Sequence, residues 1–239
     1  MKSYNRLSLL LLWIVLLSCQ PTASVDGQVA GDDNSKFAQL SQAFMETSVV
    51  PGMAVIVYQS GNIVYSEGHG YADLEQQVPV DPLNTKFRIA SISKTLTADA
   101  LAQLTEAGKL NLDAEVQEYV ASFPKKRWPV TTRMSAGHIA GIRHYRGDEF
   151  LSSKFYPTVL EGLDIFKNDP LLFEPTSKYS YSSYGFNLVS AVIEGASGES
   201  FLAYMTSHVF EPLEMNNTVP EYMDQIISGR GRYYYKSDD

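Results

Sequence analysis

The fold is decided by the stretch Phe87-Arg88-Ile89-Ala90-Ser91-Ile92-Ser93-Lys94-Thr95, which opens a helix predicted over residues 91–107. Apolar side chains recur along this segment at three- and four-residue spacing, and Gly108 is placed to cap the C-terminus. Residues three apart lie on one helix face. We therefore expect the amine of Lys94 within hydrogen-bond reach of the Ser91 hydroxyl.

A Ser-x-x-Lys pair at a helix start can form an activated nucleophile. A serine hydroxyl is weak at its free pKa, and a lysine can serve as its base only where burial or a neighbouring cation lowers the ammonium pKa. The first amides of a helix can also stabilise a developing oxyanion. On these four residues alone a second interpretation stays open, in which Ser91 merely caps the helix.

The flanking sequence predicts α and β elements in one interrupted domain. A hairpin is predicted from residues 53–59 and 63–67, which are rich in β-branched and aromatic residues around Ser60-Gly61-Asn62. A helix is predicted from Ser35 to about residue 48. Five shorter helices are predicted downstream, near residues 114–120, 132–140, 158–166, 183–196 and 201–209.

The N-terminus has the pattern of an export signal. A basic start is followed by an apolar run over residues 7–17, which is too short to span a bilayer. Leu16-Leu17-Ser18-Cys19 resembles a bacterial lipobox, and Cys19 is the single cysteine. This predicts a lipoprotein signal peptide over 1–18, a lipidated N-terminus with a flexible tether over 19–35, and an exported cell-envelope lipoprotein facing the periplasm. The alternative is an ordinary signal peptide with an incidental buried cysteine.

Composition excludes several functional classes. The net charge is −8, from 19 Lys plus Arg against 27 Asp plus Glu, and no basic cluster offsets it, so nucleic-acid binding is disfavoured. One cysteine cannot form a disulfide within the chain. The four histidines lack metal-ligand spacing, so no metal and no cofactor are expected.

Residues 87–95 resemble the nucleophile segment of the penicillin-binding-protein and class C β-lactamase superfamily of serine hydrolases. Further segments are similar to the serine β-lactamase-like proteins of mitochondria and their bacterial relatives, namely residues 130–133, 141–145 and 166–170. The resemblance covers most of residues 36–220. It implies an α+β, β-lactamase/transpeptidase-like fold, with an antiparallel sheet flanked by helices and a helical subdomain.

The resemblance also assigns a second motif, Tyr181-Ser182-Ser183, which lies six residues after Pro175. It implies a catalytic role for Tyr181 and a substrate-binding role for Ser183, where asparagine is usual. A hydroxyl has shorter reach and one donor rather than two, which shifts substrate preference. Tyr179 competes for the role by proximity, and both tyrosines could be packing aromatics. His138 lies in a segment similar to a scaffold helix of the family and is expected to be structural.

The third motif of the family, Lys-Thr-Gly or His-x-Gly, does not occur after Tyr181, where His208 is the only histidine. We therefore expect residues 36–239 to form an incomplete, C-terminally truncated domain that lacks its last strands. Loss of one oxyanion donor costs on the order of 10²-fold or more in rate.

The function that the resemblance implies is a membrane-anchored serine hydrolase acting on amide, ester or lactam substrates, as a peptidase, esterase or β-lactamase-like enzyme. Ser91 would form an acyl-enzyme, with Lys94 and Tyr181 relaying its proton; which of the two is the base stays open. The partners are a peptide, ester or β-lactam substrate and a membrane, with homo-oligomerisation left open. The alternative is a non-catalytic cell-envelope binding or assembly protein on the same scaffold.

Overall fold

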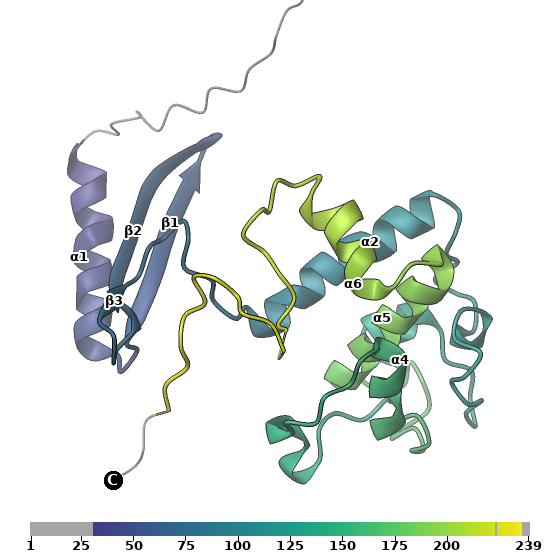
Figure 1. Cartoon of the computed structure of the whole chain (residues 1–239). Helices are drawn as coiled ribbons and strands as arrows, with labels where there is room; N and C mark the ends of the chain where they lie inside the picture. Colours follow the sequence, from purple (N-terminus) through teal and green to yellow (C-terminus); the bar gives the residue numbers. More distant parts are fainter. Residues whose placement is uncertain (1–30, 223, 236–239) are drawn as a thin grey trace, which may run out of the picture. The chain divides into compact units, whose positions relative to one another are not determined.

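The computed structural model describes residues 31–222 and 224–235. The predicted signal peptide, Cys19 and most of the predicted tether therefore lie outside the described residues. The chain divides into two compact units, one ending at Pro82 and the other comprising Leu83–Tyr235 (Figure 1). No boundary at this point is marked by the sequence pattern.

The first unit is a helix on a small antiparallel sheet. Helix α1 (Gly31–Thr47) begins four residues before the predicted start and packs against strand β2. The sheet order is β1-β2-β3, formed by β1 (Gly52–Gln59), β2 (Asn62–Asp73) and β3 (Val78–Pro79). Ser60 and Gly61 make the β1–β2 turn with φ of 50° and 87°, the left-handed pair that a tight hairpin needs. The predicted hairpin is confirmed, with a second strand that extends six residues further.

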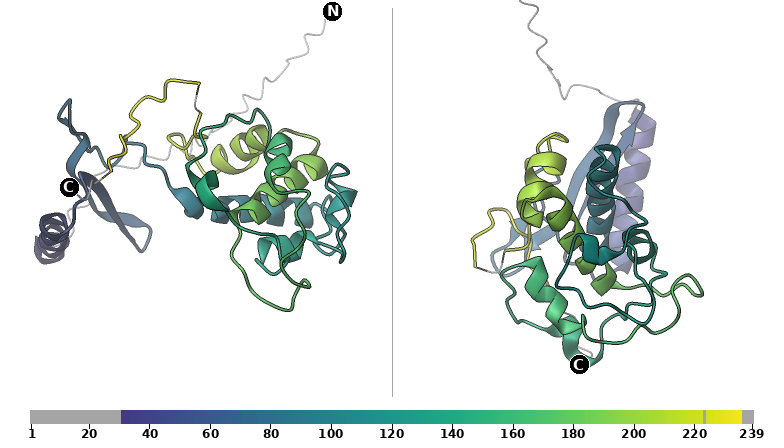
Figure 2. Two further views of the ribbon diagram at one scale, coloured as in Figure 1. Left: turned by 90° about the horizontal axis from the view of Figure 1, so that it is seen from below. Right: turned by 90° about the vertical axis from the view of Figure 1, so that its right-hand side faces the viewer.

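The second unit is helical. Its elements are the 3₁₀ turn η1 (Ala90–Ile92), α2 (Ser93–Glu106), η2 (Val116–Glu118), α3 (Thr132–Ala136), η3 (Gly147–Leu151), α4 (Val159–Gly162), η4 (Leu163–Ile165), α5 (Ser183–Ser197), α6 (Phe201–Tyr204) and the π-helical turn η5 (Met205–Phe210). Figure 2 shows these helices gathered in one cluster.

Helix α5 is the centre of the core. Its residues Leu188, Val189, Val192 and Ile193 are fully buried, and the helix contacts α2, α3, α4 and α6. Gly195 allows the closest approach, because a Cβ there would lie 2.0 Å from the carbonyl oxygen of Tyr119. Burial of each such aliphatic side chain stabilises the fold by roughly 1.5–3 kcal/mol. The packing of α2 against α5 fixes the position of the two helices, and therefore of their N-terminal ends, relative to each other.

Four predicted helices are shorter than their apolar patterns indicated. Residues 114–120 form only the turn η2, residues 158–166 divide into α4 and η4, and residues 201–209 divide into α6 and the π-helical turn η5. The helix predicted over 132–140 ends at Ala136, because His138 adopts a left-handed φ of 59° that ends α-helical geometry. This reversal directs the following segment toward α5.

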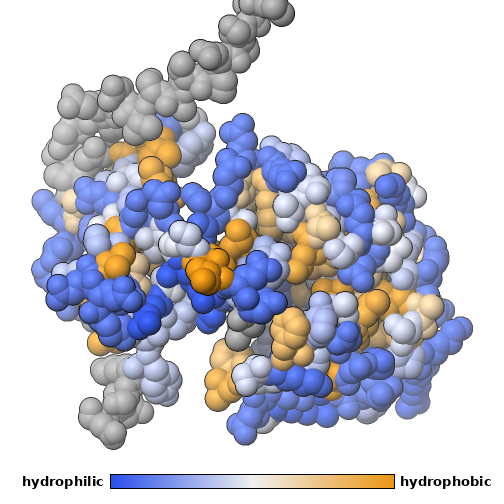
Figure 3. Space-filling model, in the orientation of Figure 1, coloured by the Kyte–Doolittle hydropathy of each residue, from blue (hydrophilic) through white to orange (hydrophobic). Residues whose placement is uncertain are grey.

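The visible surface is mostly polar, with apolar residues scattered over it (Figure 3). Within the described ranges, no helix has the length and apolar character required to cross a membrane. Residues 31–222 and 224–235 also contain no group of three histidine, cysteine or acidic side chains placed to hold a metal ion.

Candidate active site

Ser91 lies in the turn η1 that leads into α2. The preceding residue, Ala90, has a φ of 44°, a strained conformation for a residue with a Cβ. The Ser93 hydroxyl donates to the Ala90 carbonyl oxygen at 2.7 Å and supports this turn. The Ser91 side chain is exposed, so an outside molecule can reach its hydroxyl.

The structure brings together Ser91, Lys94, Tyr181 and Ser183, the four residues that the sequence analysis assigned to catalysis and substrate binding. The Lys94 ammonium donates to Ser91 Oγ at 3.1 Å, which confirms the expected contact across one helix turn. Ser91 Oγ also lies 2.6 Å from the hydroxyl oxygen of Tyr181. Lys94 Nζ is 3.5 Å from Ser183 Oγ. The site thus joins the start of α2 to the start of α5.

The site increases the acidity of Tyr181. Hydrogen bonding to Lys94 is the main cause that lowers the pKa of Tyr181, followed by hydrogen bonding to Ser91. The Lys94 ammonium also lies 5.0 Å from the centre of the Tyr181 ring and 5.4 Å from that of Phe186. Negative charge on the Tyr181 oxygen is therefore stabilised where the Ser91 proton would be received.

Tyr179 is placed differently. Its side chain is 69% exposed, and its ring packs edge-on against His138 at 5.8 Å. No hydrogen bond to Ser91 or Lys94 is formed by Tyr179 in the described part of the chain. Of the two tyrosines that the sequence left in competition, only Tyr181 contacts the serine.

Two histidines that were not predicted as site residues also contact Tyr181. The rings of His138 and His144 lie 4.5 Å and 5.5 Å from that of Tyr181, centre to centre. The sequence placed His138 in a scaffold segment and His144 in the matching stretch 141–145, but gave neither a part in the site. The segment between them forms neither helix nor strand, so no repeat within an element predicts that they meet, and the reversal at His138 contributes to bringing them together.

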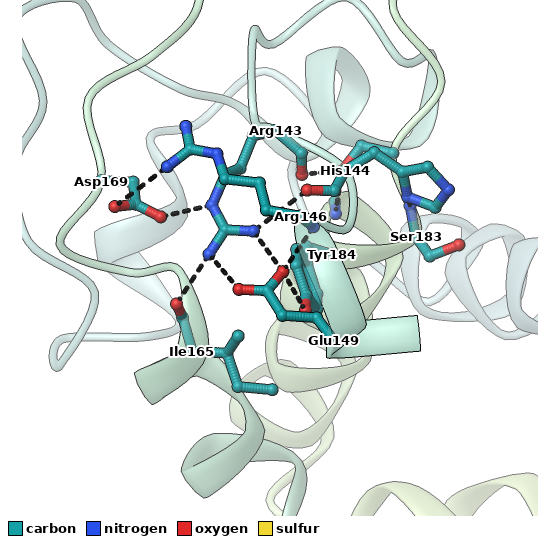
Figure 4. Close-up of polar contacts among 10 residues, drawn as sticks. Arg143, His144, Arg146, Glu149, Ile165, Asp169, Ser183 and Tyr184 are labelled. Atoms are coloured by element: carbon teal, nitrogen blue, oxygen red, sulfur yellow. Dashed lines mark hydrogen bonds and ion pairs between the residues drawn. The ribbon is translucent and has the colours of Figure 1, made fainter. Parts of the chain in front are cut away.

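Beside His144 lies an ion-pair network centred on the buried side chain of Arg143 (Figure 4). The Arg143 guanidinium, whose side chain is 6% exposed, forms two hydrogen bonds to Glu149 at 2.6 and 3.0 Å and another to Asp169. It also donates to the carbonyl oxygens of His144 and Ile165, each at 3.0 Å. Hydrogen bonding to Arg143 lowers the pKa of Glu149 to about 2.

Comparison with known proteins agrees with this architecture. The family model described as Beta-lactamase matches residues 37–234. The serine beta-lactamase-like protein LACTB, mitochondrial, of Homo sapiens is 36% identical over 254 residues, which cover 77% of this chain and 46% of the relative. The chain thus spans about half the length of that relative.

Solved structures give the same fold. The octameric penicillin-binding protein homologue from Pyrococcus abyssi superimposes with a TM-score of 0.67 at 28% identity, over 77% of this chain and 44% of that one. EstCE1, described as a hydrolase with promiscuous acyltransferase activity, superimposes with a TM-score of 0.67 at 26% identity, over 75% of this chain and 51% of that one. The predicted α+β, β-lactamase/transpeptidase-like fold is confirmed. Because the family model matches most of the length of this chain, the chain belongs to the β-lactamase family of penicillin-binding-protein-like serine hydrolases.

Proposed function

We propose that Ser91 is the nucleophile of an acyl-transferring hydrolase that acts on amide, ester or lactam carbonyls. The observation that carries the proposal is the placement of Ser91 Oγ at 2.6 Å from the Tyr181 hydroxyl and 3.1 Å from the Lys94 ammonium. A free serine hydroxyl has no partner that can accept its proton. Here the Tyr181 oxygen, which can accept that proton once the phenol is ionised, and the Lys94 amine group, which lowers the pKa of that phenol, both lie within hydrogen-bond distance of the attacking oxygen.

In the proposed first step Tyr181 is ionised as a phenolate, and Ser91 Oγ bonds to the carbonyl carbon while its proton passes to the phenolate oxygen. The carbonyl π electrons move onto the carbonyl oxygen and return as the bond to the leaving group breaks. The leaving group takes the proton from Tyr181. Water then attacks the ester formed on Ser91, with the proton moving along the same path, and releases the acid.

We propose Tyr181 rather than Lys94 as the proton acceptor. Lys94 Nζ lies 3.1 Å from Ser91 Oγ, and hydrogen bonding to Lys94 is the main cause that lowers the pKa of Tyr181. Lys94 would therefore hold negative charge on the two oxygens rather than take up the proton. Ser183, at 3.5 Å from the same ammonium, would orient it and present a hydroxyl to substrate.

The substrate class is proposed from the nucleophile and from similar proteins. An exposed serine hydroxyl can reach small acyl donors without a deep pocket. EstCE1 is described as a hydrolase with promiscuous acyltransferase activity, which supports esters among the substrates. The match to the Beta-lactamase family model supports lactams and peptides.

The first experiment is intact-mass labelling of the full chain, purified in detergent, with a fluorophosphonate and separately with a penicillin. We expect one adduct per chain on the unchanged protein and none on Ser91→Ala. Thr95→Ala is the matched control, since Thr95 is exposed on the same helix, just beyond Lys94. A folded chain that forms no adduct with either reagent would overturn the proposal and favour a binding or assembly protein.

We also propose that Cys19 carries lipid and anchors the protein to the cell-envelope membrane on its periplasmic side. The support is the lipobox-like sequence Leu16-Leu17-Ser18-Cys19 after an apolar run. The test is metabolic labelling of the full chain in a bacterial host with an alkyne fatty acid. Label in the membrane fraction that disappears in Cys19→Ser is the expected result, and equal labelling of both would contradict it.

A further inference from the structure

We propose that His138 and His144 are positioning residues that hold the Tyr181–Ser183 segment against Ser91 only while both imidazoles are neutral. Acylation of Ser91 would then be lost in acid because the support is lost. The inference rests on the proposed function of Ser91. It extends that function to two side chains that need not touch the substrate.

The first evidence is a pair of hydrogen bonds from consecutive backbone amides. The Ser182 N–H donates to Nδ1 of His138 at 3.2 Å, and the Ser183 N–H donates to Nδ1 of His144 at 3.2 Å. A ring nitrogen can accept only when it carries no proton, so each imidazole is neutral with its proton on Nε2. Since α5 begins at Ser183, the Ser183 amide has no partner within its own helix. An imidazole supplies that partner.

The second evidence is ring packing. The Tyr181 ring contacts His138 with an interplanar angle of 39° and His144 nearly edge-on at 87°. The two imidazoles therefore touch the phenol from different orientations. Tyr181 is fixed through its side chain by the same residues that fix the amides following it.

The third evidence is that the backbone at His138 and next to His144 is hydrogen-bonded to the segment that leads into α5. The Ser180 amide donates to the His138 carbonyl at 2.8 Å. The Ser182 hydroxyl donates to the Arg143 carbonyl at 2.7 Å and accepts from the Gly185 amide as the N-cap of α5. The Arg143 side chain is in turn held by the ion-pair network of Figure 4. A movement of either imidazole is therefore transmitted to the start of α5.

The charges around the pair make protonation costly. Several titratable or charged groups face the two rings. They are Lys94 from α2, Tyr145, and Tyr179 and Tyr181 from the segment before α5, and the two imidazoles also interact with each other. His69 and His208 each lie beside a glutamate, whereas within the described residues neither His138 nor His144 pairs with a carboxylate. Burial first, and then the charge of Lys94, lower the pKa of both histidines.

The consequence of protonation follows from donor geometry. A proton on Nδ1 would face an amide N–H, so an attractive contact becomes a repulsive one at both Ser182 and Ser183. A second positive charge would also lie close to Lys94. Because the folded-state pKa values lie below the ordinary histidine value, the support is fully present above about pH 6.5 and is lost as pH falls through the lower folded values.

Substitution by asparagine distinguishes the hydrogen bond that the imidazole accepts from the protonation of the imidazole. Its Oδ1 can accept the amide N–H in place of Nδ1 but cannot be protonated in this range, and asparagine tolerates the left-handed φ of His138. We therefore compare His138→Asn with His144→Asn, the two combined, and His144→Leu, which removes the acceptor. The matched control is His208→Asn, because His208 stacks on Tyr204 and contacts none of these residues.

The measurement is the second-order rate of Ser91 labelling by a fluorophosphonate on the full chain from about pH 5 to 8. The unchanged protein and the control should lose labelling steeply in acid. The double asparagine variant should be slower near pH 8, because the ring packing on Tyr181 is lost, but its labelling rate should fall less steeply in acid, while His144→Leu should be slower by about 10²-fold at every pH. Identical acid limbs in the double variant and the unchanged protein would overturn the proposal.

A second readout does not depend on activity. Imidazole ¹⁵N shifts of the histidine-labelled Ser91→Ala chain report the tautomer of each ring. Nε2–H tautomers for His138 and His144 near pH 7 support the proposal, and an Nδ1–H or charged form of either overturns it. If Ser91 is never labelled, the proposed function fails, and the acid-sensitive acylation fails with it. If both rings nevertheless show Nε2–H, the hydrogen bonds from the Ser182 and Ser183 amides to the two imidazoles are still supported.

Discussion

Replacing Arg143 with leucine should destabilise the protein more than any other single charge removal in its network. The guanidinium is 6% exposed and neutralises two carboxylates whose side chains are 29% and 31% exposed, those of Glu149 and Asp169. Removing one partner of a buried pair typically costs about 3–5 kcal/mol, because the remaining charge is left uncompensated. Both carboxylates keep some contact with water, so the low end, about 3 kcal/mol, applies.

The matched control is Arg146→Leu in the same loop. Arg146 is 54% exposed and lies 3.9 Å from Asp169, a surface pair whose loss costs at most about 1 kcal/mol. At roughly 2–4 °C per kcal/mol for a domain of this size, we expect a fall in melting temperature of about 6–12 °C for Arg143→Leu and about 4 °C or less for the control.

The assay is urea unfolding of the full chain followed by tryptophan fluorescence and far-UV circular dichroism, with thermal unfolding alongside. A double-mutant cycle with Glu149→Gln isolates the pair. Equal destabilisation by the two arginine substitutions would refute the reasoning, since it would mean that burial of the guanidinium contributes nothing. The pKa of Glu149, lowered to about 2, implies that the contribution should be observed at neutral pH.

Three further predictions concern the site and the core. Tyr181→Phe should lower the rate of Ser91 labelling by about 10²-fold, whereas Tyr179→Phe, as its control in the same assay, should change the rate little. Gly195→Ala should cost about 1–3 kcal/mol in urea unfolding, because its Cβ would overlap the Tyr119 carbonyl; an unchanged midpoint would contradict the packing. The pKa of Glu149 is lowered from 4.5 to about 2, so the stability it adds is fully present above about pH 4.5 and is lost as pH falls toward 2; Glu149→Gln should flatten the unfolding midpoint over that range.

The contact between Ser91 and Lys94 was predictable from the sequence because it is local. Residues three apart at the start of a helix lie on one face, so their side chains can meet, and the turn η1 that leads into α2 keeps this arrangement. The contact with Tyr181 was reachable only through resemblance to a family, since 90 residues separate it from Ser91. The helices over 91–107 and 183–196 were predictable for the same local reason, as each has a sustained apolar stripe.

The roles of His138 and His144 could not be predicted in this way. Their place depends on a left-handed residue in the middle of an apolar pattern that favours continued helix. It depends equally on a buried arginine whose partners lie six and 26 residues further along the chain. Neither feature can be recognised from a repeating pattern in the sequence. The first is the backbone conformation of one residue, and the second is a set of contacts between loops.

Within the described residues, the candidate site depends on the core of one unit. Ser91 and Lys94 come from the start of α2, and Tyr181 and Ser183 from the start of α5, all within Leu83–Tyr235. What holds these two starts together is the packing of the helices behind them, including the fully buried Ala100, Leu104, Leu188 and Val192. Interiors of this density cannot shift one helix without shifting its neighbours. A core substitution such as Leu188→Ala should therefore lengthen the contact between Ser91 and Tyr181 as well as lower stability, so that the rate of Ser91 labelling falls before the chain unfolds.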